Sequence, residues 1–267
     1  METYLPVPMV NSIILGVVEG ATEFLPVSST GHLLITESLL RDHRSDAFNV
    51  LVQVGPILAS ALVFRRRLAD WVFKFGDPAI RREVFQVLLA FLITGVGGLA
   101  LEKAGLKLPE SVLPVAIATL LGVPVILLVE RRAMRSSPTG GFSWSLALVM
   151  AAAQLLAAAF PGTSRSGACV MAGLLIGASR PAAVEFSFLL GIPTMFAAGG
   201  YKLLGEVRHG NARELTSADS IVAFVVATVV AFFVVQWLLG YVRSKSFIPF
   251  AWYRLALGVG LLIWALR

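Results

Sequence analysis

The stretch SIVAFVVATVVAFFVVQWLLGYV, residues 220–242, decides the fold because its 23 consecutive residues include no charged side chain. A helix needs about 20 apolar residues to cross about 30 Å of hydrocarbon, so this stretch predicts a membrane-spanning helix. The uncharged runs 84–101 and 111–129 predict two more. The whole chain is 57% hydrophobic and only 14% charged, with a mean hydropathy of +0.82, which excludes an ordinary soluble domain.

The basic residues are spread along the chain and are not gathered in one hydrophilic region. A formal net charge of +6 suits a nucleic-acid-binding protein, but clusters such as Arg65, Arg66 and Arg67 stand at the ends of apolar runs. Membrane topology accounts for these clusters better, so we expect no nucleic acid as a partner. The single cysteine, Cys169, excludes an intrachain disulfide and gives no metal cluster.

The two halves of the sequence share features at one constant offset, which is close to half the length of the chain. The matching pairs are Phe24 and Phe160, Ser28 and Ser164, Gly31 and Gly167, Gly55 and Gly191, and Gly122 and Gly258. These pairs lie at the start, middle and end of both halves. We interpret the chain 1–267 as a single membrane domain made of two pseudo-repeats, roughly 1–135 and 136–267.

Each half contains one interrupted apolar segment followed by three uninterrupted spans. In order along the chain, the interrupted segment and spans are 7–40, 47–64, 84–101 and 111–129, then 142–178, 182–204, 220–239 and 247–266. Each interrupted segment contains a proline followed by small hydroxyl residues, which breaks the helical hydrogen-bond ladder. Such backbone is tolerated at membrane depth only inside the protein or around a water-filled cavity, so we expect two re-entrant helical hairpins.

The predicted fold is therefore an all-α polytopic membrane protein with two halves, each a re-entrant hairpin plus three transmembrane helices. If each hairpin enters and leaves on one face, each half crosses the membrane three times and the halves form an inverted repeat. Twelve Lys and Arg residues then fall on one side and eight on the other. The positive-inside bias places the richer side in the cytoplasm and both termini outside.

Two acids stand in the first interrupted segment. Glu19 and Glu23 are four residues apart, so on a helix their carboxylates project from the same face. Two carboxylates repel each other and are costly within a membrane, so we expect them to face a cavity and to have a cation, an arginine or a proton as compensation. The alternative is that both are solvated residues near a helix end.

The sequence LPVSSTGH, residues 25–32, follows these acids. Its hydroxyl groups belong to Ser28, Ser29 and Thr30, and they precede the expected start of the returning helix, whose backbone amides favour an anion. A lone His32 is typical of a structural histidine. Beside two acids and three hydroxyl groups, it is a candidate general acid/base or nucleophile.

The second interruption, PGTSRSG at residues 161–167, places one arginine in a stretch that is otherwise uncharged from 136 to 179. Arg165 needs an anionic partner there, and its planar fork suits phosphate oxygens, with Ser164 and Ser166 beside it. The alternative is a purely structural ion pair between Arg165 and Glu19 or Glu23. Both interpretations hold together if the carboxylates are its partners until a substrate arrives.

Three further residues interrupt apolar spans. Gln53 is either a residue that lines the site or an amide that forms a hydrogen bond between helices. Arg254 in the last span is interpreted as an interfacial anchor, and Tyr253 as a member of the aromatic belt.

The motifs EGATEFLPVSSTGH (19–32) and FPGTSRSG (160–167) resemble the two signature motifs of the undecaprenyl pyrophosphate phosphatases, the bacitracin-resistance family. The resemblance extends to EFSFLL (185–190) and SFIPF (246–250), so it covers most of the chain in order. One departure is visible. The family pattern usually continues with threonine where this chain has Cys169, and a thiol is a weaker hydrogen-bonding group than a hydroxyl.

The resemblance implies a phosphatase of the bacterial inner membrane, with its site open to the periplasm. The substrate would be undecaprenyl pyrophosphate, a polyprenyl lipid, and the product the C55 lipid phosphate that carries cell-wall precursors. A divalent cation, Mg²⁺ or Ca²⁺, is the implied cofactor. The other partners implied are membrane lipids, and a homodimer is compatible with the family.

The resemblance also implies roles for individual residues. Glu19 and Glu23 bind the metal–pyrophosphate or tune the base, and Ser29 and His32 act as nucleophile or acid/base pair. Ser164 and Arg165 hold the pyrophosphate. From their place in the sequence, the further candidates for binding it are Ser166, Ser28, Thr30 and Gln53. The sequence leaves open which residue attacks phosphorus.

The main rival is a lipid-phosphate flippase or anion transporter, because inverted repeats with broken helices are a transport plan. A pure anion carrier has little use for an acid, a hydroxyl and an imidazole together. A structural membrane protein would leave the intramembrane charges unexplained.

Overall fold

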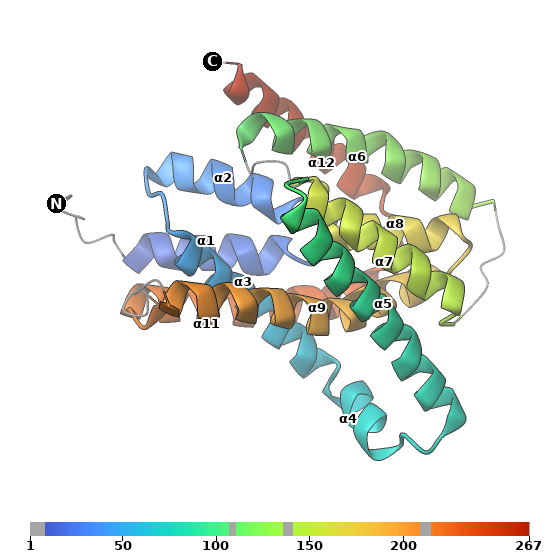
Figure 1. The fold of residues 1–267 in the computed structure, drawn as a ribbon. Helices are drawn as coiled ribbons and strands as arrows, with labels where there is room; N and C mark the ends of the chain where they lie inside the picture. Colours follow the sequence, from blue (N-terminus) through green and yellow to red (C-terminus); the bar gives the residue numbers. More distant parts are fainter. Residues whose placement is uncertain (1–8, 107–110, 136–140, 209–214, 267) are drawn as a thin grey trace.

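The computed structural model describes residues 9–106, 111–135, 141–208 and 215–266, and within these ranges it contains helices and no strand. The helices, labelled in Figure 1, are α1 (Met9–Thr22), α2 (Ser29–Leu40), α3 (Asp46–Val63), α4 (Arg65–Phe73), α5 (Pro78–Lys103), α6 (Val112–Ala133), α7 (Trp144–Ala159), α8 (Arg165–Leu175), α9 (Arg180–Arg208), α11 (Ala218–Tyr241) and α12 (Ile248–Ala265). The predicted all-α fold is confirmed. The first two residues of the predicted segment 7–40 lie outside the described residues.

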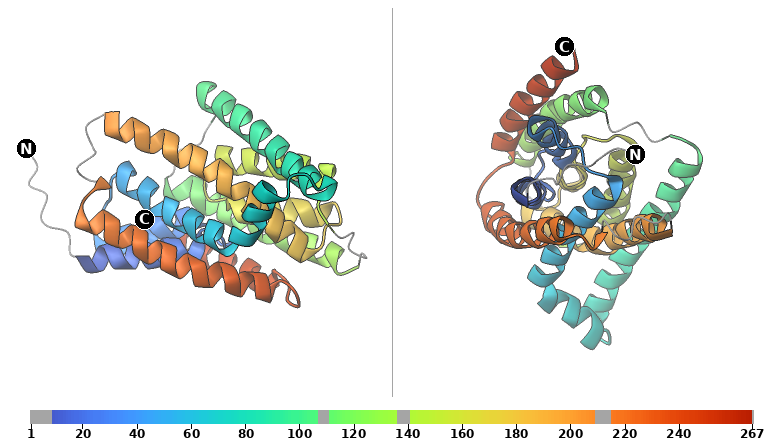
Figure 2. Two further views of the ribbon diagram at one scale, coloured as in Figure 1. Left: turned by 90° about the horizontal axis from the view of Figure 1, so that it is seen from below. Right: turned by 90° about the vertical axis from the view of Figure 1, so that its left-hand side faces the viewer.

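In the described part of the chain, six helices are long and apolar enough to cross a membrane: α3, α5, α6, α9, α11 and α12. They coincide with the six predicted uninterrupted spans, so the prediction of a multi-pass membrane protein is confirmed. Most helices run along one common direction (Figure 2, left), and α1 begins at the same end of the bundle at which α12 ends (Figure 1). In α3 and α9 at least half of the apolar window is buried inside the protein, against 17% in α5. The first two are therefore central and α5 is peripheral.

Both interrupted segments form hairpins of two short helices. Helices α1, α2, α7 and α8 have 14, 12, 16 and 11 residues. Because an α-helix rises only about 1.5 Å per residue, helices of this length are too short to cross the hydrocarbon. Within each segment the two short helices contact each other. The hairpins lie at opposite ends of the molecule, and their turns meet between them (Figure 1).

The longer helices pack around these hairpins. Helix α1 packs on α11, and α7 packs on α5; α3 contacts α9 and α11, while α12 contacts α6. A Cβ atom added at Gly16 or Gly20 would lie 2.5 Å from the carbonyl oxygen of Ala223 or Ala227, so these two glycines let α1 approach the backbone of α11. Close helix packing of this kind fixes the first hairpin to a long span.

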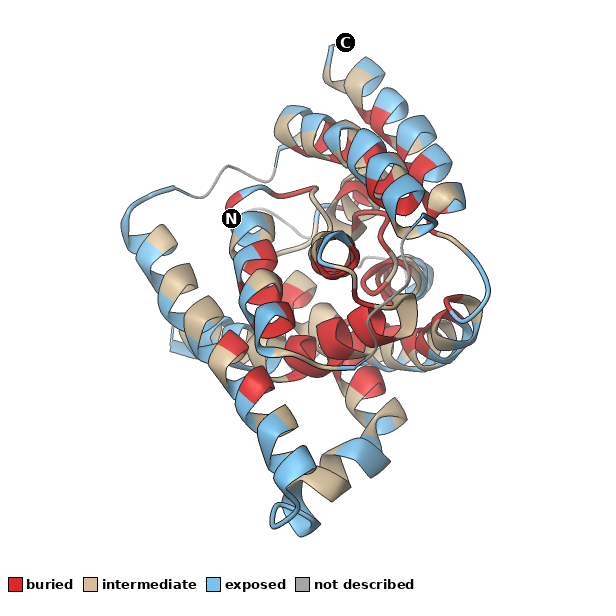
Figure 3. Ribbon diagram, turned by 90° about the vertical axis from the view of Figure 1, so that its right-hand side faces the viewer, coloured by how far each residue is buried: buried red, intermediate tan, exposed pale blue. Residues whose placement is uncertain are grey.

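Buried residues concentrate where the hairpins and the central helices meet, whereas α4 and the start of α5 are exposed and project from the bundle (Figure 3). At the end of the bundle away from α1, Glu130 is fully buried and forms an ion pair with Arg180. Its carboxylate also accepts a 2.8 Å hydrogen bond from the backbone N–H of Phe247. Glu130 thereby joins α6 to the starts of α9 and α12.

Candidate active site

The two hairpin turns have the same local structure. Ser28 precedes α2 with a φ of 73°, and Ser164 precedes α8 with a φ of 66°. Each serine hydroxyl accepts a hydrogen bond from the backbone N–H three residues on, Gly31 at 3.3 Å and Gly167 at 3.2 Å. Left-handed backbone is uncommon for serine, and N-capping offsets part of its cost. Both turns therefore present a capped helix N-terminus to the interior of the protein.

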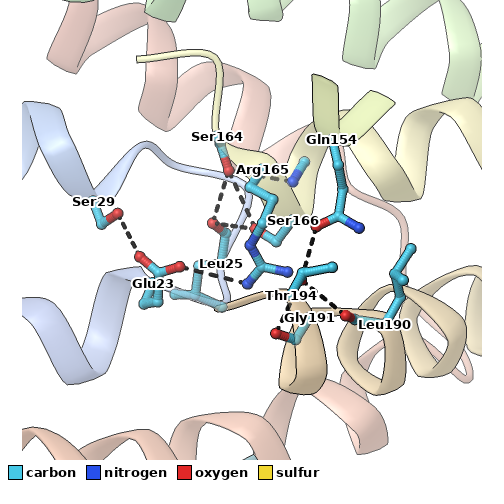
Figure 4. A network of polar contacts seen from close by, with 11 residues as sticks. Glu23, Leu25, Ser29, Gln154, Ser164, Arg165, Ser166, Leu190, Gly191 and Thr194 are labelled. Atoms are coloured by element: carbon cyan, nitrogen blue, oxygen red, sulfur yellow. Dashed lines mark hydrogen bonds and ion pairs between the residues drawn. The ribbon is translucent and has the colours of Figure 1, made fainter. Parts of the chain in front are cut away.

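The turns contact each other directly (Figure 4). The hydroxyl groups of Ser164 and Ser166 donate hydrogen bonds to the carbonyl oxygen of Leu25, at 3.3 and 3.0 Å. Residues far apart in the sequence are thus joined at the centre of the protein. These contacts place the serine-rich turn of one hairpin against the acidic end of the other.

Glu23 connects the reactive groups of the two hairpins. Its Oε2 accepts a 2.8 Å hydrogen bond from the Ser29 hydroxyl, and its Oε1 lies 3.4 Å from Nη2 of Arg165 (Figure 4). Glu23 is only 8% exposed. A carboxylate in this position can accept the hydroxyl proton, while the guanidinium stabilises the negative charge beside it. The predicted ion pair between the two motifs is present.

Arg165 keeps donors free for another partner. Within the described part of the chain, its Nε and Nη1 are buried and form no hydrogen bond. Gly191 on α9 makes room for the guanidinium, because an added Cβ would lie 2.5 Å from Nη1. Buried N–H donors are costly when unpaired, and a guanidinium matches phosphate oxygens in geometry and charge. The arrangement suits an anion.

Glu19 lies one helical turn before Glu23, is completely buried, and interacts with it electrostatically. Neither of its carboxylate oxygens accepts a hydrogen bond from any described residue. A buried carboxyl group without donors requires a proton or a cation nearby. No cluster of three or more His, Cys, Asp or Glu side chains that could hold a metal ion occurs in the described ranges. Two acids alone give few ligands, so they suit a cation that takes its other ligands from phosphate oxygens.

A polar cavity of about 200 Å³ lies at the junction of the hairpins. It is lined by Glu23, Ser28, Ser29, Thr30, Gln53, Ala157, Ala158, Pro161, Gly162, Ser164, Arg165 and Met195. Seven of the ten predicted site residues are in this lining; Glu19, His32 and Ser166 are not. Ser166 is buried by its bond to Leu25. Gln53 lines the cavity, in agreement with its interpretation as a residue that lines the site.

His32 faces α12. Its Nδ1 lies 2.8 Å from the carbonyl oxygen of Ser28, and its Nε2 lies 2.7 Å from the hydroxyl of Tyr253. A carbonyl only accepts, so Nδ1 carries the proton, and Nε2 of the neutral ring accepts from Tyr253. The catalytic role predicted for His32 stays a prediction, and the structure places its contacts at the Ser28 cap.

Several polar residues near the site were not predicted to belong to it. Thr194 on α9 donates a 3.1 Å hydrogen bond to Oε1 of Gln154 on α7, close to Arg165 (Figure 4). Gln154 had a sequence signal, as a lone amide in an apolar run.

The interpretation of Arg254 as an interfacial anchor is wrong, because its side chain is 1% exposed and binds the backbone of both turns. Cys169 is buried, contacts Met150, and does not line the cavity.

A second cavity of about 960 Å³ is almost entirely apolar. Residues of α6, α7 and α8 form its walls, among them Leu121, Val125, Ala152 and Ala172. It shares Pro161 with the polar cavity, so the two spaces adjoin at the second hairpin turn. An apolar chain and a charged group can therefore be accommodated next to each other.

Comparison with known proteins identifies the family. The family model of the bacitracin resistance protein BacA matches residues 12–260 of this chain. An undecaprenyl-diphosphatase of Rhizobium etli is 48% identical over 254 residues, 95% of this chain and 96% of that protein. An undecaprenyl-diphosphatase of Xanthomonas axonopodis pv. citri is 46% identical over 257 residues, 96% of this chain and 97% of that protein. Because the match includes both hairpins and nearly all of the chain, the protein belongs to the bacitracin resistance protein BacA family.

Proposed function

We propose that this membrane protein hydrolyses undecaprenyl diphosphate to undecaprenyl phosphate and inorganic phosphate. The observation that carries the proposal is the Ser29–Glu23–Arg165 arrangement, in which a hydroxyl, a base and a guanidinium with unpaired N–H donors border one polar cavity. The names of the relatives give the substrate. Recycling of the lipid carrier for cell-wall synthesis follows from that product.

Ser29 and Glu23 supply the chemistry in this proposal. The Ser29 oxygen attacks the terminal phosphorus while its proton moves to Glu23, and the bond between that phosphorus and the bridging oxygen of undecaprenyl phosphate breaks. Water then attacks the phosphoserine phosphorus. The Ser29 oxygen leaves with the proton held by Glu23, and inorganic phosphate is released with the remaining protons of the water.

Arg165 and the hairpin turns bind the diphosphate. The free donors of Arg165 neutralise phosphate oxygens, and backbone N–H groups at the starts of α2 and α8 contribute positive ends of helix dipoles. Thr30, Gln53 and Ser164 line the same cavity and offer further hydrogen bonds. His32 fixes the Ser28 cap in this scheme, because its Nδ1–H donates to the Ser28 carbonyl.

A divalent cation, Mg²⁺ or Ca²⁺, is part of the proposal. Glu19 and Glu23 are the residues that would hold it, since both oxygens of Glu19 are buried without a donor. When bound, the cation supplies charge neutralisation and Lewis-acid polarisation of the phosphate oxygens. Two carboxylates plus phosphate oxygens are a usual ligand set for Mg²⁺.

An inverted repeat is the proposed architecture, with pseudo-repeats close to 1–135 and 136–267. It is supported by the matching serine caps of α2 and α8 and by the helix contacts, since α1 packs on α11 as α7 packs on α5. Helices that correspond at the offset of the two halves, α3 with α9 and α6 with α12, contact each other. The hairpins would then be re-entrant from opposite faces.

The proposed location is the bacterial inner membrane, with both termini and the mouth of the site towards the periplasm. The excess of Lys and Arg beyond the ends of α3, α6 and α11 supports this orientation. Three of the basic residues counted on the sparser side, Lys107, Arg213 and Arg267, lie outside the described residues. We place the prenyl chain in the apolar cavity, which adjoins the polar one at Pro161.

Phosphate release from undecaprenyl diphosphate by purified protein tests the proposal. Wild type is expected to release phosphate, whereas Ser29→Ala and Arg165→Ala lose activity by about a hundredfold or more. Ser145→Ala, at the start of α7 and away from the cavity, is the matched control and should retain activity. Absence of release by wild type, together with lipid movement in liposomes, would reject the hydrolase in favour of a flippase.

A further inference from the structure

Arg254 on α12 uses every donor of its guanidinium on backbone carbonyl groups. Nε donates to Thr119 at 3.1 Å; Nη1 donates to Pro26 and Thr163 at 3.4 and 3.2 Å; Nη2 donates to Ala118 and Gly162 at 3.1 and 3.2 Å. An arginine side chain has five N–H donors, so five carbonyl acceptors satisfy it completely. No described carboxylate forms an ion pair with it.

The acceptors belong to three separate segments. Pro26 lies in the turn of the first hairpin, Gly162 and Thr163 lie in the turn of the second, and the remaining two lie on α6. The hydrogen bonds of Arg254 thus join both turns and a membrane span. Its 1% exposure shows that it does not act as a surface anchor.

The space for this guanidinium is provided by a glycine on α6. A Cβ atom added at Gly122 would lie 2.6 Å from Cζ and 2.7 Å from Nε of Arg254. Any other residue at this position would displace the guanidinium or the helix. Glycine at 122 and arginine at 254 therefore form one structural unit.

We propose that Arg254 is a positioning residue that holds the two hairpin turns in register, so that Ser29 and Glu23 of the first hairpin face Arg165 of the second. The inference rests on the proposed function, because it assigns a purpose to the alignment of these three groups. Arg254 lines the apolar cavity but not the polar one, and it takes no part in proton transfer. Its effect passes through the backbone of residues 26 and 162–163.

A lysine cannot replace this arginine fully. Its ammonium group has three donors at one point, whereas the five carbonyl oxygens surround a planar fork. Arg254→Lys should therefore retain charge and some bonds to the turns, and Arg254→Met should lose all of them. The conservative variant separates the geometry of the fork from the mere presence of a cation.

The test combines hydrogen-exchange mass spectrometry of the intact protein with steady-state kinetics. Gly122→Ala keeps the arginine at position 254 but fills the space that its guanidinium occupies. The matched control is Gly260→Ala on α12, where an added Cβ meets nothing within 4 Å. We expect Gly122→Ala to speed amide exchange in segments 24–30 and 160–166 together. We also expect kcat to fall about tenfold or more, because the reacting groups of the two turns are misaligned. Arg254→Lys should lie between wild type and Arg254→Met, and Gly260→Ala should match wild type.

Unchanged exchange in both turn segments and unchanged kcat in Gly122→Ala would overturn the inference. If Arg254→Met exchanges faster throughout the molecule, Gly122→Ala decides, because it keeps the arginine and its charge. If wild type releases no phosphate, the proposed function fails, and the exchange of the two turns alone decides the role of Arg254. Exchange that rises in one turn and not the other also rejects the joint positioning of both.

Discussion

The oxygens of Glu19 are buried beside Glu23 and accept no hydrogen bond from the described residues. Because two neighbouring carboxylates in an apolar setting repel each other, a divalent cation should offset their charge when the diphosphate binds. We expect EDTA to lower phosphate release at least about tenfold, and Mg²⁺ or Ca²⁺ to restore it. Glu19→Gln should raise the cation concentration needed for half-maximal release.

Glu102→Gln provides the control for this titration. Glu102 is an exposed acid near the end of α5, so its variant should follow the wild-type cation curve. Release that is insensitive to EDTA, or a Glu19→Gln curve that coincides with wild type, would show that the acids serve another purpose.

Cys169 occupies the position at which the family usually has threonine, but its buried side chain contacts Met150 and not the polar cavity. The hydroxyl of Ser187 lies close to the thiol and, among the described residues, has no hydrogen-bond partner. Cys169→Thr should therefore leave kcat and KM within about twofold of wild type, and change the free energy of unfolding by about 1 kcal/mol or less. Kinetics and thermal unfolding check this. A large gain in kcat would mean that residue 169 contacts phosphate after all.

The limits of sequence reasoning at this site have a physical cause. Glu23, Ser29 and Arg165 could be predicted because polar groups inside apolar segments need partners, whichever elements supply them. The orientation of His32 could not be predicted, because the face of α2 it occupies is decided by Tyr253, 221 positions away. For Arg254 the signal was present, a charge inside a span, but backbone carbonyl acceptors leave no pattern in a sequence.

At the scale of elements, the spans and hairpins followed from local properties: the length of apolar runs, and Pro followed by Ser, Thr and Gly. Helix α4 was not predicted, since its segment, Arg65–Phe73, combines basic and apolar residues and reads as a loop. Phe73 in it is 85% exposed, and Arg65, Arg66 and Arg67 are exposed as well. Such an amphipathic, basic helix suits the boundary between lipid and water.

The α4–α5 connection provides the sharpest test of orientation. Gly76 has open space around it, and His43, at the opposite end of α3, has an 82% exposed side chain. In a Cys169→Ala background, we expect a membrane-impermeant maleimide to label His43→Cys in cells with a permeabilised outer membrane. Gly76→Cys should react only after the inner membrane is opened, because the proposed orientation places the basic side in the cytoplasm. The reverse pattern would invert the proposed orientation.

At the scale of the whole molecule, the two hairpins contribute different groups to the polar cavity. The first carries the acids and the hydroxyl, and the second carries the arginine. The positions in the second half that correspond to Glu19 and Glu23 are the apolar Leu155 and Ala159. A polar cavity at the meeting point can hold only the diphosphate, since its volume is about 200 Å³. The long prenyl chain must lie elsewhere, and the apolar cavity of about 960 Å³ is next to it.

Narrowing the apolar cavity should therefore discriminate between substrates by chain length. Ala152 on α7 lines this cavity and is exposed within it, so Ala152→Trp adds volume there without disturbing the buried core. We expect the KM for the C55 diphosphate to rise about tenfold, because apolar contacts of the chain are lost. The KM for a C15 prenyl diphosphate should change less, since a short chain needs little of the cavity. Val225→Trp, on an exposed apolar face of α11, is the control for a tryptophan at the lipid surface. Equal effects on both chain lengths, or none on either, would move the prenyl chain to another path between the helices.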